Sequence, residues 1–568
     1  MVEGINIYAS ILDTDQLSVI RGGSFLLKDA IDQVCKSFAA SMKPLSTGAS
    51  SGLFVAGQGV TDGTAKDLCG EIRTVLASLD GNRSICFLVD SCKTTDVSEA
   101  KERLYAKIRY RQLQAVTQAP DVPIPTSPGS CELEGVRMLP QEPEKFTKTL
   151  QGRKRCLSKS VYNRYELGRK NAKFYYQDEI TKYCGDAFSD LLADLEKYAF
   201  AGDIGRLAGT DKSLRLGDKI AVVYFDGNRF GNIQKDIIRE AGKLDGQIKA
   251  QMDFDCYLKE KRARFLASVL KHMIDPARGN LLFSNATFNL DVQEKTETGK
   301  KYGIGLETLL WGGDEMLFVV PAWLGMDLVQ HFYCVSENWK IDGHRLTHAG
   351  GMVFCHAKTP VRIIRRVAQQ LAERVKSAPN GRKSNQFEYM VLESIDYPAE
   401  STLGAFFSIR YGEMAELRRP LSPFSNWAQQ KQELAELLKP DRLPKRQIWR
   451  LADLLTRQSL VECFGGRYRK GFGWAQLNED SACADDLSTL EACERHMLRL
   501  VQDPDERKRL HTGLEQIFRL VGADPTDQRE RAWAWLHLVE LWDYLVPAHK
   551  ADDEARVAPG AEAGGSHA

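Results

Sequence analysis

The stretch from residue 218 to residue 234, DKIAVVYFDGNRFGNIQ, decides the fold of the second half of this 568-residue chain. Its apolar and β-branched run IAVVYF predicts a buried strand. The run stops abruptly at Asp226, and Gly227 and Asn228 follow it as in a turn. The stretch therefore predicts a strand whose last residue brings a carboxylate to the rim of a sheet.

A second stretch, residues 305–323 (GLETLLWGGDEMLFVVPAW), predicts a β-hairpin. Two strand-like runs flank a turn at Gly312, Gly313 and Asp314, and Glu315 begins the second run. We expect this turn to be exposed. If the hairpin pairs with the strand that ends at residue 226, carboxylates from both lie at one rim of the same sheet.

The order of elements is the same in both halves of the chain. The second half is predicted to be strand, helix (254–273), hairpin, helix and a last strand (346–357), followed by an amphipathic helix (359–377). The first half is predicted to be a strand (5–15), a helix (20–40), two extended runs (45–57), a helix (64–79) and a strand (83–90). This order predicts an α+β fold with two tandem ferredoxin-like domains, each an antiparallel-centred sheet with helices on one face.

The composition limits the classes of partner. Lys plus Arg total 77 and Asp plus Glu total 76, so the whole chain has no cationic field, and any contact with nucleic acid must be local or supplied by a partner. The thirteen cysteines form no CxxC pair, and the first residues, MVEGINIYAS, lack the pattern of a secretory signal, so we expect a cytoplasmic protein. No apolar run reaches the ~18 residues that cross a bilayer, so no membrane partner is expected.

The carboxylates at the predicted rim suggest a metal site. Phosphoryl transfer from a triphosphate uses two Mg²⁺ or Mn²⁺ ions roughly 4 Å apart, and such hard cations prefer carboxylate oxygens. Asp226, Asp314 and Glu315 are the candidate ligands, and glycines at 312 and 313 let a nucleotide approach the backbone closely. Taken singly, each motif is more easily explained as an ordinary turn; together, each at the end of an apolar strand, they favour catalysis.

Several motifs resemble a known family. The segments KIAVVYFDGNRFG, LLWGGDEMLFVVP and LTHAGGMVFCHAKTP, with a helix that ends in AERVK, resemble the second palm domain of the large polymerase-like subunit of type III CRISPR effector complexes. That family is related to GGDEF diguanylate cyclases. The segment DTDQLSVIRGGSFLL resembles the first palm of the same subunit, and the resemblance continues through GDIGRLAG and the helical C-terminal part, so it covers most of the chain.

The resemblance implies a division of the chain. We expect a degenerate first palm (1–116), a linker and helical region (117–215), a second palm with the GGDE turn (216–397), a helical C-terminal domain (398–548) and a disordered tail (549–568).

The resemblance also implies an activity and its residues. ATP would be cyclised into short oligoadenylate rings that signal in antiviral defence, within a complex of CRISPR effector subunits with guide and target RNA. Asp226 and Asp314 would bind the metals, with Glu315 as a third carboxylate where the family usually has aspartate. Glutamate at that position is more similar to the motif of GGDEF cyclases. Two alternatives therefore remain open, namely another nucleoside triphosphate as the substrate and a diguanylate-cyclase-like enzyme.

A set of further residues is predicted to contact nucleotide. Lys376 matches the family's lysine for triphosphate, although it is equally well explained as a solvated cation at a helix end. The remaining candidates in the second palm are Gly227, Asn228, Gly312 and Gly313.

The first palm has TGASSG where the second has GGDE, so it should be catalytically silent. Arg21 and Ser24, in the segment RGGS, are candidates for a second triphosphate across the interface of the two palms, or the segment is simply the start of a helix. The arginines at 362, 365 and 366 are either a solvated helix face or an aid to phosphate binding.

Two departures from the family stand out. No adjacent His-Asp pair occurs, so no HD nuclease activity is expected, and Cys131, Cys156 and Cys184 are too few and too widely spaced for a zinc ribbon. The rival hypothesis is a non-catalytic subunit that binds nucleotide or serves as a scaffold in an RNA-guided complex.

Overall fold

The structure is a computed structural model, and it describes most of the chain. The described residues are 1–57, 61–79, 85–114, 129–150, 152–201, 203–208, 216–274, 287–289, 302–393, 402–424, 426–437, 503–505, 508, 512–515, 518, 521–524 and 526–545. Within them the fold is α+β, as predicted. The predicted tail, 549–568, and much of the predicted helical C-terminal domain lie outside the described residues.

The first unit is a four-stranded antiparallel sheet with the strand order β2-β3-β1-β4. Its elements are β1 (Val2–Ile5), α1 (Ile7–Ser10), α2 (Leu17–Ser37), β2 (Met42–Thr47), β3 (Ser51–Ala56), α3 (Asp62–Ser78), β4 (Cys86–Val89) and α4 (Val97–Gln114). Helices α2 and α3 pack on one face of the sheet. The other face was expected to be free of helices, but Leu45 and Leu53 pack there against α4 and against helix α9 (Phe230–Glu240) of the second unit.

The predicted strand over residues 5–15 is wrong in its position. The strand ends at Ile5, and Ile7–Ser10 form a helical turn. Asn6 causes the change, because its backbone has the left-handed φ of 54°, which starts the turn and which Asn tolerates better than most residues. Ile5 and Ile11 are both buried, so the apolar residues of this segment belong to the core although they do not share a strand.

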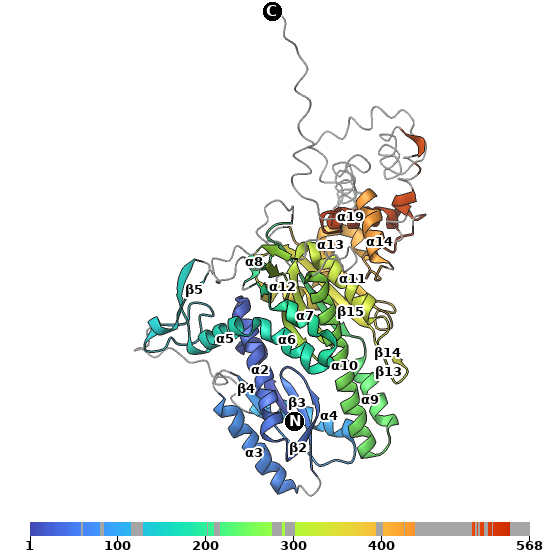
Figure 1. Cartoon of the computed structure of the whole chain (residues 1–568). Helices are drawn as coiled ribbons and strands as arrows, with labels where there is room; N and C mark the ends of the chain where they lie inside the picture. The colour runs from blue at the N-terminus through green and yellow to red at the C-terminus, as the bar shows by residue number, and fades with distance from the viewer. Residues whose placement is uncertain are drawn as a thin grey trace, which may run out of the picture.

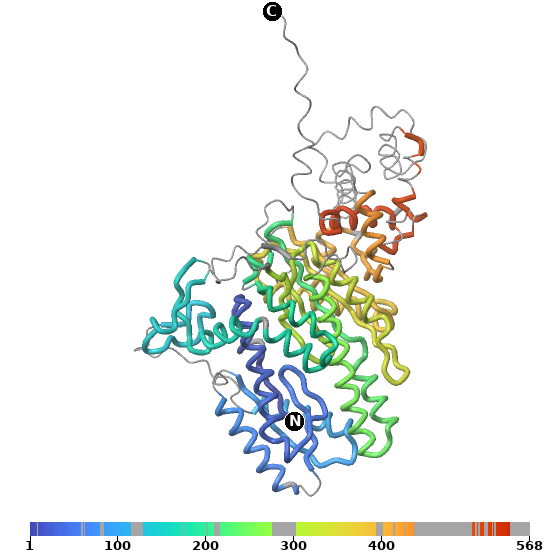
Figure 2. The backbone as a smooth tube through the Cα atoms, viewed as in Figure 1, coloured from blue at the N-terminus to red at the C-terminus, as the bar shows by residue number. Residues whose placement is uncertain are grey.

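The middle of the chain is mainly helical. It comprises a hairpin of β5 (Thr147–Leu150) and β6 (Arg153–Cys156), then α5 (Lys159–Lys170), α6 (Ala172–Cys184), α7 (Ser189–Leu195), β7 (Tyr198–Phe200) and α8 (Ile204–Leu207). The hairpin lies within the predicted linker and helical region (117–215), where no strand was expected. Figures 1 and 2 show that it stands away from the two sheets, beside the end of α2.

Two glycines let α2 and α5 cross at very short range. A Cβ added to Gly22 would lie 1.8 Å from the backbone oxygen of Arg164, and a Cβ on Gly168 would lie 1.9 Å from that of Ser18. Any side chain at either position would force the helices apart. The RGGS segment is therefore inside α2 and serves helix packing; the alternative that it begins a helix is wrong.

The second unit has a five-stranded sheet with the order β11-β12-β8-β15-β16. Its strands are β8 (Lys219–Gly227), β11 (Glu307–Gly312), β12 (Glu315–Pro321), β15 (His348–His356) and β16 (Gln386–Val391), and its main helices are α9 (Phe230–Glu240), α10 (Leu244–Ile274), α11 (Gly325–Ser336) and α12 (Val361–Ser377). Short strands β9 (Thr287–Asn289), β10 (Tyr302–Ile304), β13 (Lys340–Ile341) and β14 (His344–Arg345) lie outside this sheet. If β16 is left aside, the order across this sheet is the same as in the first unit: the hairpin, then the first strand, then the last strand.

Helices from the C-terminal part pack on the second unit, at the end of the molecule away from the first unit (Figure 1). They are α13 (Leu403–Tyr411), α14 (Trp427–Leu437) and α19 (Gln528–Leu545). Buried ion pairs join the two parts: Arg418 Nε lies 2.8 Å from Glu388 Oε1, and Lys431 Nζ lies 2.8 Å from Asp327 Oδ2. In the part of the chain that the structure describes, no helix has the length and apolar character needed to span a membrane.

Candidate functional site

The pairing of β8 with β12 brings the predicted carboxylates together. Asp226 and Glu315 are direct partners in this antiparallel pair, and Asp314 occupies the turn between β11 and β12. The backbone N–H of Gly227 donates to the carbonyl of Asp314 across 3.1 Å, which fixes the turn against the end of β8. The predicted hairpin is thus observed, and the condition that it pairs with the strand ending at residue 226 is met.

The glycines of the motif act mainly on the backbone. A Cβ on Gly227 would lie 2.7 Å from the Cβ of Asp314, so only glycine allows the turn to approach β8 this closely. Gly313 has a φ of 56°, which favours glycine in the turn. A Cβ on Gly312 would reach ordinary contact distance, 3.6 Å, from Ala49 in the turn of the first unit. The two hairpin turns therefore face each other across the interface of the units.

Lys376 lies in the last turn of α12, beside Asp226. Its Nζ is 2.5 Å from Asp226 Oδ2, and both side chains are about nine-tenths buried. It is therefore not a solvated cation at a helix end. That Lys376 contacts triphosphate stays a prediction.

The three carboxylates share a crowded, poorly solvated environment. Burial is the main cause that raises the pKa of Asp226, of Asp314 and of Glu315 above their usual ranges. Repulsion between neighbours adds to it, from Asp314 on Asp226 and from Glu315 on Asp314, whereas Lys376 opposes it. The expectation of an exposed turn is wrong for the two acidic residues, because Asp314 and Glu315 are half-buried between the two units.

Tyr224 belongs to this site although the sequence analysis did not select it. It is buried two residues before Asp226 on the same face of β8, and its hydroxyl lies 3.5 Å from Asp226 Oδ2. Burial, with Asp226 and Glu315 nearby, raises the pKa of its hydroxyl, so it keeps its proton. The sequence did contain a signal for it, because Tyr224 stands two residues before Asp226 and residues two apart in a strand lie on the same face.

The donor chemistry of the rim fits a hard divalent cation. Its carboxylate oxygens are the ligands that Mg²⁺ and Mn²⁺ prefer, and Asp226 already binds a cationic group, the ammonium of Lys376. Among the described residues, however, no three or more His, Cys, Asp or Glu side chains are close enough together to form a ready ligand set. Metal binding therefore requires these side chains to rotate toward one another.

A test of this crowding is the pH dependence of stability. A carboxylate whose folded-state pKa is raised stabilises the fold only at low pH, and this contribution is lost as pH rises through the folded pKa. We therefore expect Asp314→Asn to raise the thermal midpoint at pH 7.5, in metal-free buffer, and the gain to disappear near pH 4. Asp253→Asn, at an exposed position of α10, is the matched control and should change little. A lower midpoint for Asp314→Asn at pH 7.5 would contradict the crowding.

A cavity adjoins the GGDE turn, between α2, α6, α10, α12 and the two hairpin turns. Its lining carries the cations Arg21, Lys28, Lys182, Lys259, Arg262, Arg362 and Arg365. It also carries the carboxylates Asp32, which pairs with Lys28 and Lys182, and Glu179, which pairs with Lys28. Aromatic rings of Phe25, Tyr175, Tyr183 and Trp311 also line it. Of the predicted arginine cluster on α12, residues 362 and 365 thus face this cavity. A cavity with cations and aromatic rings suits an anionic ligand that carries a planar base.

Arg262 is the most informative cation of this cavity. It is 5% exposed, and its Nε and Nη1 have no hydrogen-bond partner in the part of the chain that the structure describes. The centre of its guanidinium lies 5.2 Å from the ring centroid of Trp311. A buried cation with unused donors is costly unless an anion pairs with it. Arg262 was not among the site residues predicted from the sequence, because it is one of several basic residues in the run KEKRAR.

Arg21 and Ser24 line the same cavity, but the Arg21 side chain is engaged elsewhere. Arg21 Nε donates to Glu307 Oε1 across 2.8 Å, Nη2 pairs with the other carboxylate oxygen, and Nη1 donates to the carbonyl of Gly168 across 3.0 Å. The hydroxyl of Ser24 donates to the carbonyl of Ile20, one turn earlier. A role of either residue in nucleotide binding stays a prediction.

The side-chain nitrogen of Asn228 is engaged in the fold, whereas its buried Oδ1 has no hydrogen-bond partner among the described residues. Its amide donates to Thr347 Oγ1 and to the carbonyl of Gly381, each across 3.1 Å. It thereby fastens the end of β8 to the loop that follows α12. Contact of Asn228 with nucleotide stays a prediction.

The chain was compared with known proteins. No protein-family model matches it, and no curated protein matches it. Among solved structures, it is similar to Csm1 in T. onnurineus, with a TM-score of 0.41 and 12% identity over 95% of this chain and 69% of that chain. It is also similar to a Csm1-Csm4 cassette in complex with cA4 (TM-score 0.39, 13% identity, 92% and 69% covered) and to a Csm1-Csm4 subcomplex of the type III-A CRISPR-Csm interference complex (0.36, 12%, 90% and 69%).

Proposed function

We propose that this chain is a metal-dependent nucleotidyl cyclase, which joins ATP or another nucleoside triphosphate into a cyclic oligonucleotide. The observation that carries the proposal is the pairing of β8 with β12, which sets Asp226 opposite Glu315 and Asp314 beside them. Two apolar strands that both end in carboxylates at one rim destabilise the fold unless a cation is bound there. The cationic cavity next to the turn supports the same proposal.

The site residues have distinct roles in this proposal. Asp226, Asp314 and Glu315 would hold Mg²⁺ or Mn²⁺, which would supply charge stabilisation for the triphosphate and for the pyrophosphate that leaves it. Lys376 is close enough to Asp226 to move onto the phosphates of the same nucleotide. Tyr224 keeps its hydroxyl proton and orients Asp226 by donating to it.

A second nucleotide would lie in the adjoining cavity. The free donors of Arg262 suit its phosphates, and the ring of Trp311 suits its base. The first unit contributes the turn around Ala49, which has no carboxylate and faces Gly312. In this arrangement the second unit performs the chemistry and the first unit closes the cavity.

The biological setting is proposed from the sequence motifs. A role in antiviral defence, in the cytoplasm and beside CRISPR effector subunits with guide and target RNA, is what their resemblance implies. Glu315 in place of aspartate leaves the choice of base open between ATP and another triphosphate.

A non-catalytic nucleotide-binding or scaffold subunit is the second candidate. The observation that favours it is the ion pair of Lys376 with Asp226, together with the lack of a ready ligand set among the described residues. In that case Lys376 would remain paired with Asp226 permanently.

Pyrophosphate release separates the two candidates. The full chain should release pyrophosphate from at least one of the four ribonucleoside triphosphates with Mg²⁺ or Mn²⁺, and release should stop with chelator. If no triphosphate is consumed, by the chain alone or with partner subunits and target RNA, the non-catalytic candidate is correct.

Substitution of Arg262 tests the cavity. Arg262→Gln should weaken nucleotide binding at least about tenfold, since hydrogen bonds to a charged group contribute about 1.5–3 kcal/mol. It should not lower the thermal midpoint, because it removes a buried charge with unused donors. Binding is measured by isothermal titration with a non-hydrolysable triphosphate.

Arg264→Gln, two residues later on α10, is the matched control. Arg264 is about half exposed and pairs with Glu260, so its loss should leave the affinity unchanged. Equal affinities for the two variants would show that Arg262 does not contact nucleotide.

A further inference from the structure

One segment of this nearly neutral chain is strongly basic. Residues 145–173 contain ten Lys or Arg and one Glu, a net charge of +9, whereas the whole chain has +1. The segment comprises β5, β6, α5 and the start of α6. Its hairpin projects from the body of the molecule beside the first unit (Figures 1 and 2).

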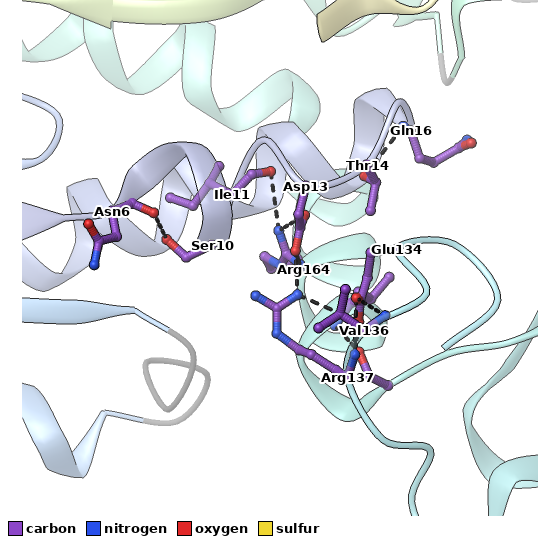
Figure 3. Close-up of polar contacts among 12 residues, drawn as sticks. Asn6, Ser10, Ile11, Asp13, Thr14, Gln16, Glu134, Val136, Arg137 and Arg164 are labelled. Carbon is purple, nitrogen blue, oxygen red and sulfur yellow. Dashed lines mark hydrogen bonds and ion pairs between the residues drawn. The ribbon is translucent and has the colours of Figure 1, made fainter. Parts of the chain in front are cut away.

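Some cations near this hairpin are already neutralised. Figure 3 shows Arg164 and Arg137 converging on Asp13, and the two Nη atoms of Arg164 each lie 2.9 Å from an Asp13 carboxylate oxygen. These contacts attach the hairpin region to the first unit. Lys145 and Lys148 pair with Glu142 and with Glu166.

Five of the remaining cations make no ion pair among the described residues. Five side chains are exposed or half exposed and make no ion pair with a carboxylate of the described residues: Arg153, Lys154, Arg155, Lys159 and Lys170. Arg153 and Arg155 lie on one face of β6, about 6.6 Å apart along the strand, which is comparable to the spacing of neighbouring phosphates on an extended strand. We name these five residues the basic hairpin surface.

We propose that the basic hairpin surface binds the sugar-phosphate backbone of a single-stranded nucleic acid. This goes beyond the proposed cyclase activity, because it concerns a surface that is separate from the carboxylate rim and its cavity. In the same segment, the half-buried rings of Phe146 and Tyr162 pack edge to face, and Lys148 Nζ, which pairs with Glu166, lies 4.7 Å from the Tyr162 centroid. Aromatic rings of this kind suit contact with unpaired bases. A lipid surface is disfavoured, since neither β5 nor β6 exposes an apolar side chain.

The test measures binding of a labelled, mixed-sequence RNA of about 20 nucleotides. Fluorescence anisotropy monitors the binding at salt concentrations between ~50 and ~200 mM. The variant Arg153→Glu/Lys154→Glu/Arg155→Glu should lose about a hundredfold in affinity at 0.1 M salt. The slope of log affinity against log salt should fall by about two, because each phosphate contact on a single strand contributes about 0.7 to it.

The matched control reverses three exposed lysines elsewhere, Lys66→Glu/Lys243→Glu/Lys249→Glu, for the same change in net charge. It should bind RNA nearly as tightly as the unaltered chain. A single-stranded DNA of the same sequence tells whether the backbone is RNA or DNA, and binding of either supports the proposal. Equal losses in both variants, no binding of either strand, or binding of phosphatidylserine vesicles instead would each overturn it.

Discussion

Asp226→Asn is expected to lower nucleoside triphosphate turnover by at least about a hundredfold while the protein stays folded. Removing one ligand from a metal site takes away several kcal/mol of charge stabilisation in the transition state, and each ~1.4 kcal/mol is a factor of ten in rate. Asparagine has the same size, and its oxygen still accepts a hydrogen bond from Lys376, so the rim keeps its packing. Turnover is measured as pyrophosphate release at saturating Mg²⁺ or Mn²⁺.

The control for this variant is Asp253→Asn, an exposed aspartate on α10 away from the rim, which should keep normal turnover. Two results would contradict the role of Asp226. If Asp226→Asn unfolds, as judged by circular dichroism, the residue is structural. If it keeps near-normal turnover, the reaction takes place elsewhere in the chain.

Arg21→Met is expected to destabilise the fold by about 3–5 kcal/mol, a large part of the stability of a domain. Arg21 and Glu307 form a buried ion pair, with side-chain exposures of 6% and 2%, that joins α2 of the first unit to β11 of the second. Removing the arginine leaves the Glu307 carboxylate buried without its counter-ion. Urea unfolding of the full chain measures the change.

The double variant Arg21→Met/Glu307→Leu should recover most of the lost stability, because no unpaired charge remains. This pair of variants also decides between the two roles of Arg21. A single variant that keeps its stability but binds nucleotide at least tenfold more weakly would show that the sequence-based prediction of a triphosphate contact is correct and that the structural role is minor.

The carboxylate rim could be predicted from the sequence because its signals are local. IAVVYF is an unbroken apolar run and GGDE sits between two such runs, so strand, turn and carboxylates are all fixed by residues near one another in the chain. The pairing of β8 with β12 was only a condition of that prediction, and the structure meets it. The prediction that Asp314 and Glu315 are exposed was wrong, because their exposure depends on the first unit. The turn around Ala49 in that unit contacts Gly312.

Residues whose role depends on a distant partner could not be predicted in this way. Arg262 looks like any other cation in KEKRAR, and only the folded chain buries it beside Trp311. The RGGS segment that contains Gly22 suggested a triphosphate site or a helix start. The role of Gly22 depends instead on Gly168, nearly 150 residues later in the chain, where α5 crosses α2. The hairpin of β5 and β6 was missed since its strands are short and polar, so neither carries a hydrophobic pattern.

The product of the reaction tests the central claim most directly. The full chain, with its partner subunits and target RNA where these are needed, is incubated with each ribonucleoside triphosphate and Mn²⁺, and the products are analysed by mass spectrometry. We predict an oligonucleotide ring without a terminal phosphate, formed from one preferred triphosphate, and none with Asp314→Asn. Unchanged triphosphate in every reaction, or a ring formed equally well by Asp314→Asn, would contradict the account.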